Sequence, residues 1–328
     1  MSILAFIVIA FMVTMYVLLD GYDLGAAAIA PLIARSDRER AAAMASIGPF
    51  WNGNEVWLIA AGAGLFALFP TAYASSFSGF YLPFIVMLWL LMFRGIALEL
   101  REHLPSELWH QFWDAAFCLS SALLIVVLGV TLGNLLRGLP LDASGYFQGT
   151  FAFLLNPYAL LVGLFALATL AQHGAAFVAL RVVGELGERA TRTVLDLWWL
   201  VGALYIAVTV LTLRVHAPVG TWWLGAIPVL SIAALTLLRL AAVHGHAIAA
   251  FVASSGFIVT LMIASAGTLF PYLLPAFPAG RGGISIFDAA PSSVALSCAL
   301  TVTIVGIVLV SVYAPVVWRR MGGKIRVE

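Results

Sequence analysis

The chain has 328 residues, of which 63% are hydrophobic and only 9% are Asp, Glu, Lys or Arg, with a formal net charge of +1. Soluble proteins carry about 25% charged residues. This composition, with a mean hydropathy of +1.07, therefore excludes a water-soluble enzyme, a disordered regulator and a secreted scaffold. The small net charge also provides no electrostatic surface for nucleic acid.

Long apolar runs separated by turn residues predict about nine transmembrane helices. One span needs about 20 apolar residues, and an open strand in lipid would leave its backbone groups unpaired. We therefore expect an all-α polytopic membrane protein with one integral-membrane domain over residues 1–328, built as two four-helix bundles plus one peripheral helix. The helices are expected at 3–27, 50–70, 78–99, 113–135, 153–180, 194–213, 221–243, 247–270 and 293–318.

The basic residues indicate the orientation of these spans. An odd number of spans places the two termini on opposite sides of the membrane. With the C-terminus in the cytoplasm, 13 of the 16 basic residues lie on the cytoplasmic side, and Arg137, Arg214 and Arg281 lie outside. The 13 are Arg35, Arg38, Arg40, Arg94, Arg101, Arg181, Arg189, Arg192, Arg239, Arg319, Arg320, Lys324 and Arg326. By the positive-inside rule, the sequence predicts an outside N-terminus and a cytoplasmic C-terminus.

Small residues at helical spacing predict close helix contacts. Gly21 and Gly25, and likewise Gly129 and Gly133, are four residues apart within predicted spans. This spacing lets helix backbones approach closely in lipid. We interpret both pairs as packing sites.

Carboxylates within the spans are the main functional candidates, because charges in the bilayer are expensive. Asp20 and Asp23 are spaced i, i+3 on one helix face, and Asn52 and Glu55 have the same spacing in the next span. Asp20 lies roughly 25 Å along the first span, in its cytoplasmic third. Desolvation raises the pKa of a carboxyl group in an apolar site, which suits it to proton exchange near neutral pH. The sequence thus predicts a proton pathway, open to the cytoplasm, through Asp20, Asp23 and Glu55, with Asn52 on the same helix face as Glu55.

Four further residues are expected at the same depth as a supporting polar cluster. They are Trp51, Arg94, Glu99 and His173. Arg94 is expected to pair with Asp23 or Glu55. The alternative is that all these groups only brace the helices or lie at the interface.

The sequence contains no common cofactor motif. It has no Walker loop, no GxGxxG after a strand, no Cys-x-x-Cys-His and no HExxH. We predict neither a metal site nor a redox centre in this chain.

Several of these stretches resemble subunit II of cytochrome bd-type quinol oxidases. The resemblance is carried by residues 19–25 (LDGYDLG), 48–57 (GPFWNGNEVW), 133–138 (GNLLRG) and 173–175 (HGA), together with Arg94. It covers roughly the first 190 residues closely, and the remainder mainly in helix count.

The resemblance implies a heterodimeric respiratory complex of the bacterial inner membrane that oxidises quinol and reduces dioxygen to water. In that family subunit I carries haems b and d, whereas subunit II ligates no haem. Subunit II supports the assembly, helps proton uptake from the cytoplasm, and can hold a structural quinone or lipid. A small single-helix subunit and membrane lipids are further expected partners.

One position departs from the family. After the first Trp of the 48–57 motif many relatives have an Asp assigned to the proton inlet, and here it is Asn52. An amide cannot carry a proton by ionising, so Asp23 and Glu55 would have to take over, water would have to bridge past Asn52, or the inlet would run elsewhere.

Two other functions compete with an oxidase subunit. A proton-coupled secondary transporter would use Asp20, Asp23 and Glu55, although transporters place polar groups near the midplane. A purely structural subunit would use the same carboxylates only as helix braces.

Overall fold

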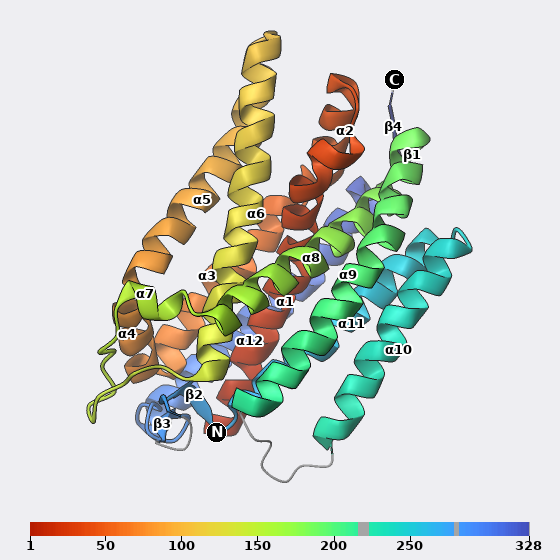
Figure 1. Cartoon of the computed structure of the whole chain (residues 1–328). Helices are drawn as coiled ribbons and strands as arrows, with labels where there is room; N and C mark the ends of the chain where they lie inside the picture. The colour runs from red at the N-terminus through yellow and green to blue at the C-terminus, as the bar shows by residue number, and fades with distance from the viewer. Residues whose placement is uncertain (216–222, 279–281, 328) are drawn as a thin grey trace.

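The computed structural model is a helical bundle whose termini lie at opposite ends (Figure 1). It describes residues 1–215, 223–278 and 282–327. Arg281 and the first two residues of the predicted helix 221–243 lie outside the described residues.

Long helices account for most of the chain. The helices are α1 (Ser2–Ile33), α2 (Asp37–Ile47), α3 (Trp51–Leu68), α4 (Pro70–Gly79), α5 (Tyr81–Leu100), the 3-10 turn η1 (Arg101–His103), α6 (Glu107–Arg137), α7 (Phe151–Leu154), α8 (Pro157–Arg181), α9 (Glu185–Val215), α10 (Trp223–Val243), α11 (Ala247–Leu269) and α12 (Ser293–Met321). Two short pairs of strands complete the fold. The strands are β1 (Val182–Val183) parallel to β4 (Ile325–Arg326), and β2 (Tyr272–Pro275) antiparallel to β3 (Gly283–Ser285).

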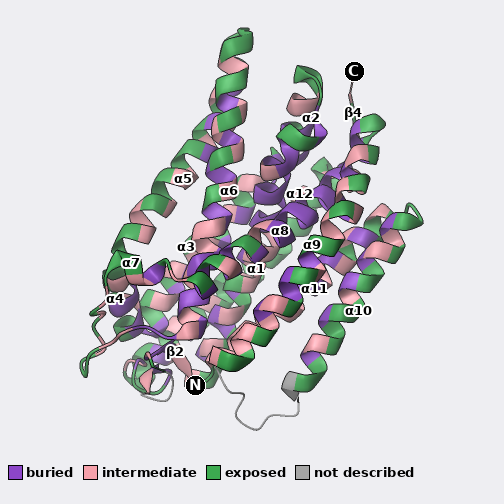
Figure 2. Ribbon diagram, in the orientation of Figure 1, coloured by how far each residue is buried: buried purple, intermediate pink, exposed green. Residues whose placement is uncertain are grey.

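The predicted all-α membrane architecture is confirmed. Helix α8 packs against α6, α9 and α1, and α10 packs against α11, so the expected division into two four-helix bundles stays a prediction. Helix α12 lies at the edge against α3. The core runs along α1 and α8, which are buried over much of their length (Figure 2). Helix α5, by contrast, buries only Arg94 and Ala97, and α12 buries only Leu296 and Leu300.

The number of spans differs by one from the expectation. Within the described residues, eight helices are long and apolar enough to cross a membrane. Helix α3 is not among them, because its 18 residues begin with the polar run 51–55 (WNGNE). The ninth span at 50–70 therefore stays a prediction.

Several helix boundaries were wrong. The span expected to start at 78 starts at Tyr81, because a separate helix, α4, fills residues 70–79. Helices α6 and α9 begin six and nine residues earlier than the predicted 113 and 194. Helix α2 was missed, although Ser36 caps it by accepting a hydrogen bond from the Glu39 N–H. This Ser-x-x-Glu spacing is that of a capping box.

The glycine pairs do mark close helix contacts. A Cβ on Gly25 would lie 1.8 Å from the Leu170 carbonyl oxygen of α8, and one on Gly174 would lie 2.0 Å from the Ala26 nitrogen of α1. A Cβ on Gly133 would lie 2.7 Å from the Ala159 Cα. Helices α1 and α8 can therefore cross at this point only if both contact positions lack a side chain.

An ion-pair network covers the end of the bundle where α2 lies. The Arg101 guanidinium contacts Asp114 at 2.7 Å and Asp37 at 2.5 Å, and His110 contacts Asp37 at 3.2 Å. Arg189 of α9 pairs with Glu39 of α2 and donates to the Ile33 carbonyl. These contacts fix α2 across the ends of α1, α6 and α9.

Candidate functional site

The centre of the candidate site is a buried ion pair between α1 and α5. The Arg94 guanidinium donates to both carboxylate oxygens of Asp20, at 3.0 and 2.6 Å, and both side chains are at most 1% exposed. Such bidentate pairs are the strongest of the charge-assisted hydrogen bonds. The expected partner of Arg94 was therefore wrong in part. Asp20 takes the guanidinium, and Asp23 lies at 3.9 Å from it.

Asp23 is held mainly from α3. The Asn54 side-chain amide donates to Asp23 Oδ2 at 2.7 Å and to the Tyr22 hydroxyl at 2.8 Å. Asn54 is buried, whereas Asn52 is exposed. Sequence reasoning missed Asn54 and Tyr22, because the i, i+3 spacing selected Asn52 and Glu55 as the functional face of this helix.

Three buried polar atoms around this centre have no hydrogen-bond partner within the described part of the chain. They are the Tyr16 hydroxyl, Arg94 Nε and Asp23 Oδ1. Buried polar groups in proteins are almost always hydrogen-bonded to protein or to ordered water. The two donors and one acceptor therefore make this region suitable for internal water.

Asn52 and Glu55 lie outside the buried face of α3 that carries Asn54, and Asn52 is exposed. Glu55 is half-buried and makes no hydrogen bond or ion pair with any described residue. It still lies within electrostatic range of Arg94 and Asp20. The four expected pathway residues thus form a buried pair of acids and a pair on the lateral surface of α3.

The expected supporting cluster is only partly assembled. The Trp51 ring lies 6.0 Å from the Arg94 guanidinium carbon. Glu99 is exposed on α5, and its side chain contacts none of the other three. Glu99 was therefore placed wrongly, since five residues on a helix place it well over a turn away from Arg94.

His173 holds three helices together beside this centre. Its Nε2 lies 3.1 Å from the Leu18 carbonyl of α1, and its Nδ1 lies 2.9 Å from the Ser254 hydroxyl of α11. A carbonyl can only accept, so Nε2 carries the proton and Nδ1 can accept from Ser254. The ring also stacks on Phe251 at 4.9 Å. Both nitrogens are thus occupied, and His173 acts as a helix brace in this arrangement.

An aromatic layer separates the buried acids from the end of the bundle that carries α2. Tyr22 stacks on Phe177 at 4.0 Å, and Phe50 lies 4.9 Å from Trp318. The Arg181 guanidinium covers the Phe50 ring at 5.3 Å and the Trp318 ring at 5.9 Å. Phe50, Phe177 and Arg181 are buried, whereas Trp318 is 37% exposed. Apolar rings therefore pack between the buried acids and this end of the bundle.

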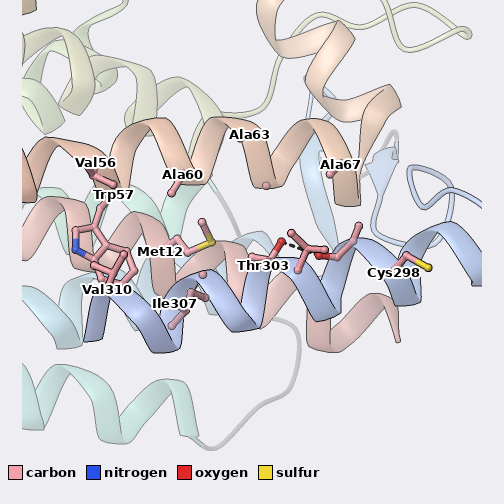
Figure 3. Close-up of a pocket in the computed structure, with 14 residues that line it drawn as sticks. Met12, Val56, Trp57, Ala60, Ala63, Ala67, Cys298, Thr303, Ile307 and Val310 are labelled. Carbon is pink, nitrogen blue, oxygen red and sulfur yellow. Dashed lines mark hydrogen bonds between the residues drawn. The ribbon is translucent and has the colours of Figure 1, made fainter. Parts of the chain in front are cut away.

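A groove opens on the surface of α3 that includes Val56, the residue after Glu55. It has a volume of about 520 Å³ and runs between α3 and α12 (Figure 3). Small residues line much of it, including Ala60, Ala63 and Gly306. Its polar side chain Thr303 donates to the carbonyl of Ala299 in its own helix. The groove therefore presents shape and apolar surface, with little means of recognising a polar ligand.

The charges of this cluster are unevenly balanced. Within the described residues, no group of three or more His, Cys, Asp or Glu side chains is placed to hold a metal ion. The Asp20–Arg94 pair is charge-balanced, and Asp23 and Glu55 are the carboxyl groups left without an arginine of their own.

Comparisons with known proteins agree on one family. Residues 1–321 match the model of the family described as cytochrome bd terminal oxidase subunit II. The chain is 31% identical to cytochrome bd-I ubiquinol oxidase subunit 2 of Escherichia coli K12, covering 94% of this chain and 91% of that protein. It is 34% identical over a shorter stretch, 62% of this chain and 59% of the relative, to cytochrome bd ubiquinol oxidase subunit 2 of Bacillus subtilis.

A solved structure shares the fold. The bd oxidase structure from Geobacillus thermodenitrificans contains a chain that superposes with a TM-score of 0.81 at 18% identity, covering 97% of both chains.

Proposed function

This chain belongs to the cytochrome bd terminal oxidase subunit II family, and from that premise we propose how it serves a quinol:oxygen oxidoreductase. The comparisons support the interpretation as an oxidase subunit, and they do not support the alternative of a proton-coupled transporter. We propose that this chain ligates no haem, supports a subunit I that carries haems b and d, and passes protons from the cytoplasm toward it. Quinol and dioxygen would then react on the partner subunit.

The proton role is assigned to Asp23 and Glu55 rather than to Asp20. Asp20 is balanced by Arg94 through two short hydrogen bonds, so releasing or taking a proton there would break a buried ion pair. Asp23 keeps one oxygen without a protein partner among the described residues, and Glu55 keeps both. Asn54, which donates to Asp23, would then position that carboxyl group.

The route would open sideways from α3. The packed rings of Phe50, Phe177 and Trp318 lie along the bundle axis toward α2 and make that direction an unfavourable route for water. Asn52 is exposed and Glu55 half-buried on the lateral face of α3. Polar side chains at membrane depth are found against protein or a water-filled cavity, not against lipid. We therefore propose that subunit I covers this face, and that protons enter between the two subunits.

The groove between α3 and α12 supports the same interface. It adjoins this face at Val56, the neighbour of Glu55, and its small residues would accept side chains of a partner helix. Helix α5 is also largely exposed, as expected for a helix that meets a further subunit in the complex. A structural quinone or lipid and a small single-helix subunit stay predictions. A quinone ring would find little in this groove to bind its oxygens.

The expected orientation would place the α2 end of the bundle in the cytoplasm of a bacterium, with the inner membrane around the helices. The basic residues support this proposal. Arg181 ends α8, Arg319 lies in the last turn of α12, and Arg35 follows α1. Arg101 begins η1, and Arg189 lies near the start of α9. The ends of α8 and α9 concerned lie at the end of the bundle that carries α2 and the C-terminus (Figure 1).

The test is turnover of the assembled oxidase against pH in four single variants, one of them a control. We expect Asp23→Asn and Glu55→Gln to lower turnover by roughly 10²-fold, the low end of what a positioned proton-transfer group contributes. Asp23→Glu should restore part of the loss. Glu99→Gln is the matched control, because Glu99 is an exposed carboxylate on a neighbouring helix.

Haem spectra and copurified subunit I establish assembly before turnover is compared. Unchanged turnover in both assembled variants would overturn the proton role and favour a purely structural subunit. Absence of a haem-bearing partner from the purified complex would overturn the partner assignment itself.

A further inference from the structure

The C-terminal segment of the chain carries a cluster of basic residues with no assigned role. It comprises Arg319 and Arg320 in the last turn of α12 and Lys324 and Arg326 in the segment that follows, and we name it the cationic segment. All four residues are exposed, and none has an ion pair with any described residue. We propose that the cationic segment is a binding site for the headgroups of anionic phospholipids.

The segment is held in a defined place. Arg181, which is buried, donates to the carbonyl oxygens of Met321 and Gly323. Just beyond, β4 pairs in parallel with β1, with Ile325 opposite Val182. The segment is therefore tied to the ends of α8 and α12, and its charges are presented from a fixed backbone.

The acids on the neighbouring elements are already paired. Helix α2 packs beside β4, and its Asp37 and Glu39 contact Arg101 and Arg189. On α9, Glu185 contacts Arg189 at 3.2 Å, and Glu188 lies 3.7 Å from Arg192. Each acid that these two helices offer at this end has another basic partner. The cationic segment thus retains a positive potential.

The geometry of α12 places this potential at a lipid surface. Val305, Val312 and Arg319 are spaced by seven residues and so share one face of the helix. The two valines are 54% and 65% exposed. An exposed apolar face that ends in basic residues is the pattern of a helix leaving the hydrocarbon for the headgroup layer. Basic clusters just beyond a transmembrane helix attract anionic headgroups, so phospholipid phosphate is the ligand that this position meets.

The experiment counts the lipids retained by the purified complete oxidase. The complex is reconstituted in phosphatidylcholine with a minor fraction of phosphatidylglycerol of the same acyl chains, and native mass spectrometry gives the ratio of the two retained lipids. We expect the wild type to be enriched in phosphatidylglycerol. Each Gln substitution at Arg319, Arg320, Lys324 or Arg326 should lower the enrichment roughly fivefold, and added salt should lower it in the wild type.

Controls separate this site from general surface charge and from the partner subunit. Arg192→Gln removes an exposed charge that already faces Glu188 and should leave the enrichment unchanged. Arg319→Lys keeps the charge and should do the same. Haem content and oxidase turnover report assembly, so a folding failure is recognised separately.

Three results would overturn the proposal. One is a wild type without preference for phosphatidylglycerol, and another is an unchanged preference in the variant with all four substitutions. The third is loss of subunit I with unchanged lipid retention, which would show that these charges bind the partner protein. None of these outcomes depends on the proton role of Asp23 and Glu55.

Discussion

The buried pair of Arg94 and Asp20 allows a quantitative test of the site. The change Arg94→Met removes the guanidinium and keeps an apolar side chain of similar length. Asp20 loses two hydrogen bonds, and Asp23 loses a cation at 3.9 Å. Removing one partner of a buried ion pair costs about 3–5 kcal/mol. Because two fully buried carboxylates are left facing each other, we expect a loss of about 5 kcal/mol in the free energy of unfolding.

A second substitution should recover much of this loss. In Arg94→Met combined with Asp20→Asn the remaining carboxylate is Asp23, which still receives the Asn54 amide at 2.7 Å. Replacing both charges of a buried pair by neutral groups is often close to neutral. The double variant should therefore be more stable than Arg94→Met alone, with a coupling energy of about 2–3 kcal/mol.

The assay is denaturant unfolding of the complex in a fixed lipid mimetic, followed by the haem absorption of the assembled oxidase. The order of stability should be wild type, then the double variant, then Arg94→Met. Additive losses in the two single variants, or near-wild-type stability of Arg94→Met, would refute the argument that a single buried pair holds α5 to α1.

Three further changes test other parts of the structure. Asn52→Asp should leave oxidase turnover near the wild-type value if water passes this position, and a large gain would show that the amide is a bottleneck. Gly174→Ala should cost at least about 1–3 kcal/mol through overpacking and lower the thermal midpoint of the complex, whereas Gly62→Ala, with no atom within 4 Å of its Cβ, should not. Burial raises the pKa of Asp37, but the Arg101 charge and hydrogen bond bring that pKa below the ordinary aspartate value of 3.8. The small stabilisation from Asp37 is then present above pH 3.8 and is lost as the pH falls through the lower folded-state pKa; a thermal-midpoint titration in which Asp37→Asn keeps the same acid dependence would contradict this.

Hydrophobic patterning carried most of the information about the fold. The lipid environment demands long apolar helices and closely packed small residues, and both demands leave marks in a single sequence. The crossing of α1 and α8 at Gly25 is one such mark. Helix α3 shows where the pattern is weak, because its polar first turn keeps it below the hydropathy of a span although the helix is present.

The candidate carboxylates could also be identified from the sequence, because an acidic residue within a long apolar run is rare and easily recognised. Asp20, Asp23 and Glu55 were identified in this way. Helical spacing alone could not decide which acid meets Arg94, because 74 residues separate Arg94 from Asp20 along the chain. The rotation of α3 was equally undetermined, and it selects Asn54 over Asn52 as the partner of Asp23.

The sequence by itself thus determined that this protein is embedded in a lipid bilayer, where most of its helices lie, and to which family it belongs. The tertiary structure decided which charges neutralise each other, and which carboxylates have no arginine of their own. The physical reason is one of range. Burial in lipid acts on every residue through its own polarity, whereas a hydrogen bond depends on the placement of two side chains that only the packing of separate helices brings within 3 Å.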